Sequence, residues 1–234
     1  MDISVVIPTY NEKNNVLPSV EVIEPVLKRL SERYEIIFVD DSSPDGTADV
    51  IRGLQKRDAN IKLVVRTKKD GIGGAHMAGF DAASYGTIIT LDADLSQDPK
   101  YFNDFVKRLD EGYDMVIGSR YVEGGGSEGQ TFIKKFASRI VNLLGFLILG
   151  IRIKDASHSF RAFRRSVYGE MRGTVKSKGH PDFEIEFTYR ALRNGHKIAE
   201  IPMTFVESSG KKSNINFFTA FFDYLRALIR IKAG

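Results

Sequence analysis

The chain has 234 residues and a mass of 26.2 kDa, which suits one domain with a sizeable core. Its composition, 42% hydrophobic and 27% charged, is that of a globular protein and excludes collagen-like, mucin-like and linker-dominated chains. Because the sequence contains no cysteine, it excludes a disulfide framework, a thiolate zinc site and a cysteine nucleophile.

Charge is divided unevenly along the chain. Residues 1–129 carry 15 Lys and Arg against 22 Asp and Glu, whereas residues 130–234 carry 19 against 8. A basic second half indicates an anionic partner: a phosphorylated lipid, an acidic membrane surface or nucleic acid. We expect a lipid or membrane partner and no nucleic acid.

The first half alternates between apolar, β-branched runs and amphipathic stretches. In chain order we expect strands at 3–7, 35–39, 62–65, 87–91 and 115–117, and helices at 14–33, 47–58, 73–84 and 99–111. This alternation predicts an α/β fold with an open, mostly parallel sheet covered by helices. Ligands of such sheets bind beyond the carboxyl ends of the strands.

The second half begins with a glycine-rich loop after Arg120, followed by helices at 130–150 and 183–194, a strand at 198–206 and a last helix at 215–232. No linker separates the halves, so we expect a single domain over 1–234. The last helix is amphipathic, with an expected apolar face of Phe218, Phe221, Phe222, Leu225, Leu228 and Ile229.

The relation of the chain to membranes can be predicted from two segments. The N-terminus lacks the layout of a signal peptide, so we expect the chain to be cytoplasmic. The longest apolar run, 140–151, is shorter than the roughly 20 residues that span a bilayer. The stretch 132–151 and the helix at 215–232 instead predict peripheral binding in the membrane interface. The alternatives are that both pack onto the sheet, or that the helix at 215–232 leads into transmembrane helices.

Polar motifs follow the first two strands. Tyr10 and Glu12 follow the first, and Asp41 follows the second. An aromatic ring and acids at adjacent strand ends can stack on a nucleobase and accept hydrogen bonds from it or from a ribose. The sequence Asp45-Gly46-Thr47 is equally typical of a turn that caps a helix, so the second motif alone does not distinguish a nucleotide site from a helix cap.

The strongest signal is Asp92-Ala93-Asp94, directly after the strand at 87–91. Two carboxylates at the end of a buried strand need a compensating charge. A divalent cation, Mg²⁺ or Mn²⁺, supplies it and completes its coordination with water and substrate phosphates. The motif alone is weak, and its position beside two nucleotide-binding candidates strengthens it.

Four strings in this order, PTYNE, FVDDSSPDGT, DADLS and GSRY, resemble the inverting glycosyltransferases of family 2, which have the GT-A fold. Within the family the chain is most similar to the dolichyl-phosphate mannose synthases. The resemblance implies transfer of a hexose, with GDP-mannose as the favoured nucleotide-sugar donor, to a dolichyl or polyprenyl phosphate. It also implies a donor half, 1–121, and an acceptor half, 122–234.

The resemblance implies a role for each matching residue. The residues implied in donor binding are Pro8, Tyr10, Glu12, Val39, Asp41, Arg66, Lys68 and Ala93. Asp92 and Asp94 are implied in metal binding and catalysis, and Arg120 is implied in catalysis beside the transferring phosphates. The residues implied in binding the acceptor phosphate are Lys134, Ser138, Arg139, Lys211 and Lys212. The acceptor half departs from the pattern. The family usually has Arg where Lys134 stands and Gly where His158 stands, and the basic residues around 209–214 are displaced.

The chemistry of the acceptor leaves alternatives open. A lipid phosphate arrives ionised and needs only cationic positioning, whereas an alcohol on a glycan needs a carboxylate base, for which Glu186 is the candidate. UDP-glucose is an alternative donor. A sugar-1-phosphate nucleotidyltransferase lacks support, because its glycine-rich opening is missing, and a non-enzymatic membrane protein would have no use for Asp92 and Asp94. Direct attack by a phosphate on an α-linked donor would give a β-linked product.

Overall fold

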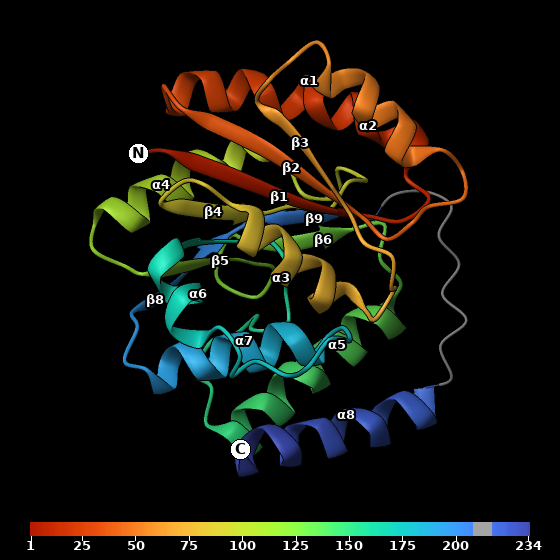
Figure 1. Cartoon of the computed structure of the whole chain (residues 1–234). Helices are drawn as coiled ribbons and strands as arrows, with labels where there is room; N and C mark the ends of the chain where they lie inside the picture. The colour runs from red at the N-terminus through yellow and green to blue at the C-terminus, as the bar shows by residue number, and fades with distance from the viewer. Residues whose placement is uncertain (208–216) are drawn as a thin grey trace.

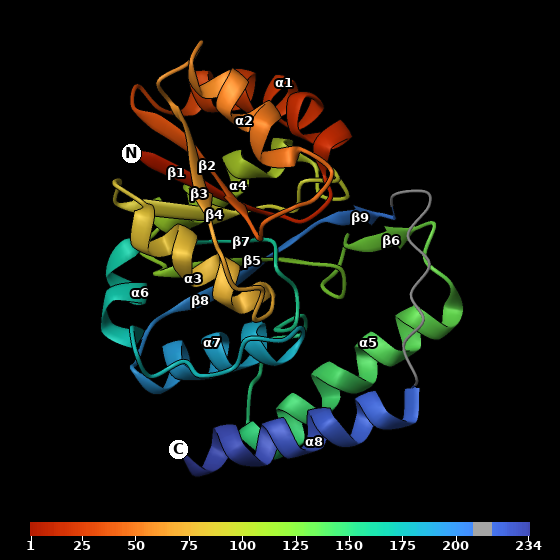
Figure 2. The same cartoon turned by 45° about the vertical axis from the view of Figure 1, so that its right-hand side comes forward.

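The computed structural model describes residues 1–207 and 217–234, with side chains in the second segment from residue 221 onward. Its centre is a seven-stranded sheet in the order β3-β2-β1-β4-β7-β5-β8, with a separate two-stranded sheet of β6 and β9. Helices cover both faces of the large sheet (Figures 1 and 2). The predicted α/β fold with a mostly parallel sheet is confirmed.

The elements follow one another as the alternation of apolar runs predicts. The strands are β1 (Ile3–Thr9), β2 (Tyr34–Asp40), β3 (Ile61–Val65), β4 (Thr87–Thr90), β5 (Met115–Ser119), β6 (Gly126–Glu128), β7 (Arg161–Arg164), β8 (Ile198–Pro202) and β9 (Thr204–Val206). The helices are α1 (Lys13–Leu30), α2 (Thr47–Gln55), α3 (Ile72–Ala82), a 3₁₀ turn η1 (Pro99–Tyr101), α4 (Phe102–Asp110), α5 (Phe132–Leu144), a π-helical turn η2 (Gly145–Leu149), α6 (Arg165–Met171), α7 (Asp182–Arg193) and α8 (Phe217–Ala233).

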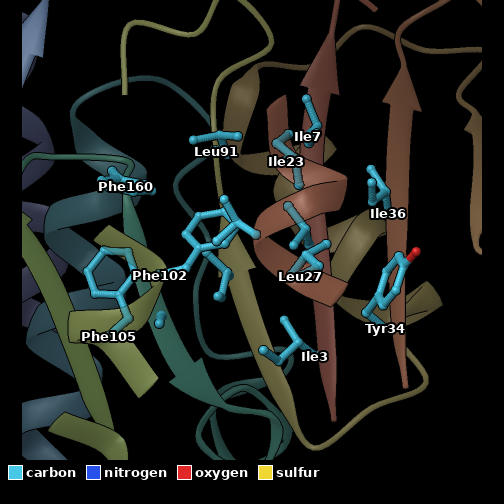
Figure 3. Close-up of a cluster of buried hydrophobic side chains, with 14 of the residues drawn as sticks. Ile3, Ile7, Ile23, Leu27, Tyr34, Ile36, Leu91, Phe102, Phe105 and Phe160 are labelled. Atoms are coloured by element: carbon cyan, nitrogen blue, oxygen red, sulfur yellow. The ribbon is translucent and has the colours of Figure 1, made fainter. Parts of the chain in front are cut away.

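Two apolar layers hold the sheet between its helices. On one face, β1 and β2 pack against α1 and α4 through side chains such as Ile23, Leu27, Phe102 and Phe105, part of the cluster drawn in Figure 3. On the other face, a second cluster joins the sheet to α3, α6 and α7. Both faces of β1 and β2 are fully buried, which is why these strands are continuous apolar runs rather than alternating ones.

The sequence did not predict β7, which runs antiparallel between β4 and β5. It pairs Arg161 with Thr90 and with Ile117, so β7 begins where its two neighbours end. The preceding segment, 155–160, therefore lies at the same edge as the carboxyl ends of the parallel strands. Strands β7 and β8 complete the sheet begun by 1–121, so the donor and acceptor halves share one core.

Two further expectations for the second half need correction. The strand expected over 198–206 is two strands in different sheets, interrupted at Met203, whose side chain is buried. The helix expected at 215–232 is present as α8, but its packing face differs. Leu228 is buried together with Tyr224 and Ile231, whereas Phe222 and Ile229 are exposed. In the described parts of the chain, no helix combines the length and the apolar character needed to span a membrane.

Candidate active site

A pocket of about 340 Å³ lies at the carboxyl ends of β1, β2 and β4. Seven of the predicted donor-site residues line it: Pro8, Tyr10, Glu12, Asp41, Asp92, Ala93 and Asp94. They come from three separate motifs, which the parallel pairing of β1 with β2 and β4 brings to one edge. The structure thus gathers these residues where the strand-end rule predicts a ligand.

The loops that follow β1, β2 and β4 share an unusual backbone feature. Asn11, Ser42 and Leu95 all have positive φ angles, between 53° and 58°, a conformation that costs energy for residues other than glycine. Hydrogen bonds hold the first two loops together: the backbone N–H of Asn11 donates to the Ser43 hydroxyl at 3.0 Å, and that of Glu12 donates to the Thr47 hydroxyl at 3.0 Å. The pocket is therefore shaped before any ligand binds.

Asp92 is held by two side chains that sequence reasoning missed. The Gln97 amide donates to Asp92 Oδ2 at 2.6 Å, and its oxygen accepts from the Asp92 backbone N–H at 2.9 Å. The Ser159 hydroxyl, at the segment before β7, lies 3.4 Å from both carboxylate oxygens. Gln97 is fully buried and follows Asp92 by five residues. In the sequence it is visible only as an amide residue near the acidic motif.

The acidic pair has the chemistry of a site for a hard cation. Burial, followed by the neighbouring Asp94 carboxylate, raises the pKa of Asp92 to about 6. A buried carboxylate beside a second one favours its neutral form unless a positive charge is brought to it. Among the described residues no cluster of three or more His, Cys, Asp or Glu could hold a metal by itself. The pair therefore suits a cation that takes its remaining ligands from water and substrate phosphates.

Asp41 and Arg66 form an ion pair at the side of the pocket. The Arg66 guanidinium lies 2.7 Å from Asp41 Oδ1 and also contacts the Asp70 carboxylate. Burial raises the pKa of Asp41, and the Arg66 charge opposes that rise. Arg66 thus holds Asp41 in place instead of lining the pocket.

Two other predicted donor residues lie away from the pocket lining. Val39 is fully buried in the core, and Lys68 is exposed and does not line the pocket. The neighbouring Lys69 lines the pocket instead, with its Nζ 3.1 Å from the centre of the Tyr10 ring. A cation at this distance from an aromatic face is attracted to it. Lys69 was therefore missed by one position.

On the acceptor side, Arg120 follows β5 and is locked to Asp155. Its Nε donates to Asp155 Oδ2 at 2.8 Å, and its Nη2 donates to Oδ1 at 2.7 Å and to the Ser138 hydroxyl at 3.0 Å. The structure therefore brings Arg120 and Ser138 together. Gly118, two residues before Arg120, allows Phe160 to pack closely against β5, because a Cβ there would lie 2.8 Å from the Phe160 ring.

The other described residues predicted to bind the acceptor phosphate, Lys134 and Arg139, have different partners. Lys134 forms an ion pair with Glu207, a partner that the sequence did not indicate. Arg139 is exposed, and its guanidinium lies 5.7 Å from the centre of the Tyr121 ring. Lys211 and Lys212 lie outside the described residues. Of the predicted phosphate clamp, Ser138 contacts Arg120, while Lys134 and Arg139 lie on the same helix, α5.

Buried Arg161 fixes the segment 155–160, which contacts Asp92 through Ser159 and Arg120 through Asp155. Its guanidinium donates to the Ala156 carbonyl at 3.2 Å and to the His158 carbonyl. Both nitrogens of the buried His158 lack a hydrogen-bond partner among the described residues, and its ring packs edge-on against Phe205. We find no structural explanation for the departure from glycine at this position.

Glu186, the candidate base for an alcohol acceptor, has a structural role instead. It is buried, and its Oε2 accepts hydrogen bonds from the backbone N–H groups of Lys176 at 3.1 Å and Ser177 at 2.7 Å. Its Oε1 lies 3.2 Å from the Arg190 guanidinium. The carboxylate therefore fixes the loop before α7 and does not line the donor pocket.

Replacing Glu186 with Gln should destabilise the protein while leaving its activity largely intact. The amide keeps one acceptor but loses the charge that holds Arg190, so we expect unfolding to be easier by about 1–3 kcal/mol. Chemical denaturation measures this change, with the exposed Glu111→Gln as a control that should change little. A loss of sugar transfer of about a hundredfold or more, with the fold retained, would instead identify Glu186 as a base.

Comparison with known proteins identifies the class to which this fold and pocket belong. The model of the family named Glycosyl transferase family 2 matches residues 4–172, which include all three pocket loops. The chain belongs to this family.

Two similar proteins extend the match to nearly the whole chain. The chain is 36% identical over 226 residues to polyprenol monophosphomannose synthase of Mycolicibacterium smegmatis, covering 93% of this chain and 83% of that protein. It is 33% identical over 214 residues to undecaprenyl-phosphate mannosyltransferase of Micrococcus luteus, covering 88% and 84%. The resemblance to family 2 is thus confirmed well beyond the four motifs.

Solved structures share the fold at lower identity. Glucosyl-3-phosphoglycerate synthase from Mycobacterium tuberculosis, in complex with Mn²⁺, UDP and phosphoglyceric acid, has a TM-score of 0.72 at 19% identity, covering 100% of this chain and 78% of that one. A mannosyltransferase from Pyrobaculum calidifontis in complex with GDP-Man and Mn²⁺ has a TM-score of 0.66 at 18% identity, covering 99% and 63%. These likenesses confirm the GT-A architecture.

Proposed function

We propose that the protein transfers a hexosyl group, mannose from GDP-mannose, to a polyprenyl or dolichyl phosphate with inversion at the anomeric carbon. One arrangement carries the proposal: an acidic donor pocket and a cationic side at Arg120 and Ser138, joined by the segment 155–159. Both similar proteins are named for mannose transfer involving a polyprenyl carrier.

The donor pocket suits a nucleotide sugar. Tyr10 offers an aromatic face for a base, and Asp41, held by Arg66, offers carboxylate oxygens to base or ribose donors. Asp92 and Asp94 would hold a divalent cation, Mg²⁺ or Mn²⁺, which when bound neutralises the charge that develops on the leaving diphosphate. Gln97 and Ser159 fix the orientation of the Asp92 carboxylate.

The acceptor side suits a phosphate that is already ionised. An oxygen of the lipid phosphate attacks the anomeric carbon, and the bond from that carbon to the diphosphate breaks, with its electron pair leaving on GDP. No proton has to be removed, so no carboxylate base is needed. The commitment of Glu186 to the loop before α7 favours this acceptor over an alcohol.

A lipid acceptor requires access to a membrane, and α5 offers it. Phe132, Ile133 and Phe136 are exposed, with Phe132 at 80%, and the apolar surface continues on η2 at Leu147. In Figure 2, α5 and α8 lie together away from the sheet. Exposed apolar rings beside Lys and Arg are typical of helices that lie in a membrane interface. We propose peripheral binding at a membrane surface, with the cytoplasmic face as the expected side.

The donor assignment is tested by release of nucleoside diphosphate. The protein is incubated with GDP-mannose or UDP-glucose, with Mg²⁺ or Mn²⁺, and with or without a short polyprenyl phosphate. We expect release from GDP-mannose that depends on both the cation and the lipid phosphate. Turnover of UDP-glucose alone would replace the proposed donor, and lipid-independent release would refute the proposed acceptor.

The ion pair between Lys134 and Glu207 predicts competition with the acceptor. Because Glu207 neutralises a cation proposed to bind the lipid phosphate, Glu207→Gln should lower the KM for polyprenyl phosphate about two- to tenfold, with kcat little changed. Steady-state kinetics measure the effect. In a Lys134→Ala background the second substitution should do nothing, and an unchanged KM in the single variant would show that the pair does not compete.

A further inference from the structure

A second cavity, of about 550 Å³, lies beside α5 and is separate from the donor pocket. Its walls come from three segments: Tyr121 after β5, Arg139 and Asn142 on α5, and Arg152 and Lys154 between η2 and β7. Arg120 also lines it, but the Arg120 guanidinium is already engaged by Asp155 and Ser138. Nothing in the proposed transfer reaction uses Arg152 or Lys154.

The cavity carries uncompensated positive charge. Within the described ranges, 1–207 and 217–234, none of Arg139, Arg152 and Lys154 forms an ion pair. The nearby carboxylates are occupied elsewhere. Asp155 binds Arg120, and Glu200 accepts hydrogen bonds from the backbone N–H groups of Lys154 and Asp155, both at 2.9 Å. Within these ranges the three cations are therefore not paired with a carboxylate side chain, and Glu200 contributes one negative charge beside Lys154.

The same cavity has an apolar side that faces outward. Leu143 and Phe146 line it, and they are 53% and 47% exposed. They continue into the exposed apolar surface of α5 and η2, at Phe136 and Leu147. The Tyr121 hydroxyl is buried without a hydrogen-bond partner among the described residues. Cations, an unused hydroxyl and an apolar rim together match a phosphate joined to an acyl chain.

We propose that this cavity binds the phosphate headgroup of an anionic membrane phospholipid that is not a substrate. The lipid would fix α5 at the membrane surface while the acceptor uses Arg120, Ser138 and Lys134. Lys134 and Ser138 do not line the cavity, whereas Arg120 and Arg139 do, so the two phosphate sites lie side by side, with Arg152 and Lys154 in the second. The inference rests on the membrane location in the proposed function, and it adds a lipid that anchors α5 at the membrane surface.

The test uses short-chain lipids that stay monomeric in water. Titration calorimetry measures binding of dihexanoyl phosphatidylglycerol, dihexanoyl phosphatidylcholine and inorganic phosphate to the full chain. We expect saturable binding of one phosphatidylglycerol and much weaker binding of the other two. Equal binding of phosphatidylcholine would overturn a role for charge, and equal binding of inorganic phosphate would overturn the lipid assignment.

Matched double variants test the residues. Arg152→Gln with Lys154→Gln should weaken phosphatidylglycerol binding about tenfold or more, as expected from losing two cations near a lipid phosphate. Arg193→Gln with Lys232→Gln removes the same charge from exposed positions outside the cavity and should change binding little. Equal losses in both variants would show only long-range attraction and would overturn the proposal. Thermal unfolding confirms that each variant is folded.

Failure of this inference can be distinguished from failure of the proposed function. In detergent-free solution, the Arg152→Gln/Lys154→Gln variant should transfer mannose to a short polyprenyl phosphate at the rate of the unaltered protein. Displacement of phosphatidylglycerol by the polyprenyl phosphate would assign the cavity to the acceptor and overturn the proposal. If the unaltered protein transfers no sugar, the proposed function fails, whereas selective phosphatidylglycerol binding would still support this site.

Discussion

Replacing Asp94 with Ala should lower sugar transfer by about a thousandfold or more. The substitution removes one of two carboxylates proposed to hold the cation that neutralises the leaving diphosphate, a contribution worth several kcal/mol in the transition state. The fold should survive, because Asp94 is only partly buried and follows β4 without belonging to it. Initial rates of GDP release from GDP-mannose measure the loss.

A matched control separates this effect from a general loss of negative charge. Asp110, exposed at the end of α4, can be replaced by Ala with the same change in charge and should leave the rate within about twofold. Binding of Mn²⁺, followed by paramagnetic broadening, should weaken only in the Asp94 variant. Full activity of that variant would remove the acidic pair from the proposed chemistry.

Replacing Asp155 with Asn should destabilise the protein by about 3–5 kcal/mol, because it leaves the buried Arg120 guanidinium without its counter-charge. Burial alone would raise the pKa of Asp155, but hydrogen bonds and the charge of Arg120 outweigh it and hold the pKa below its ordinary value. The stabilisation is therefore present at neutral pH and lost as the pH falls below the ordinary carboxyl range.

Denaturant unfolding at neutral pH measures the effect, with an exposed ion pair as control. Asp223 and Arg226 lie 3.1 Å apart on α8 with side chains 70% and 79% exposed, so Asp223→Asn should change stability by less than about 1 kcal/mol. The Asp155 variant should also lose transfer, because Arg120 is released from Ser138. A loss no larger than that of the control would mean that the buried pair does not hold the acceptor side together.

The residues of the pocket at the strand ends were predictable because each motif lies next to its strand in the sequence. Each motif directly follows an apolar run, and parallel strands place their carboxyl ends at one edge, so Tyr10, Asp41 and Asp92 could be brought together from the sequence alone. Two residues differ from the expected placement: Lys69 rather than Lys68 lines the pocket, and Val39 lies in the core. Gln97 was not predicted, because a single amide residue belongs to no sequence motif that would indicate its partner.

The acceptor side depends on contacts between distant segments, which local patterns do not reveal. The four-residue strand β7 is too short to stand out, and its insertion between β4 and β5 is what places Ser159 beside Asp92 and Asp155 beside Arg120. Lys134 and Glu207 are likewise far apart in the sequence. Apolar residues lie on two sides of α8, and only packing decides that Leu228 is buried while Phe222 and Ile229 are exposed.

The most direct test of the proposed function compares two acceptors of the same length, a short polyprenyl phosphate and the corresponding polyprenol, each with GDP-mannose and Mn²⁺. Radiolabelled mannose should enter the lipid fraction only with the phosphate, and NMR of the product should give a β-linked mannosyl phosphate. Transfer to the alcohol, or an α-linked product, would contradict direct attack by an ionised phosphate.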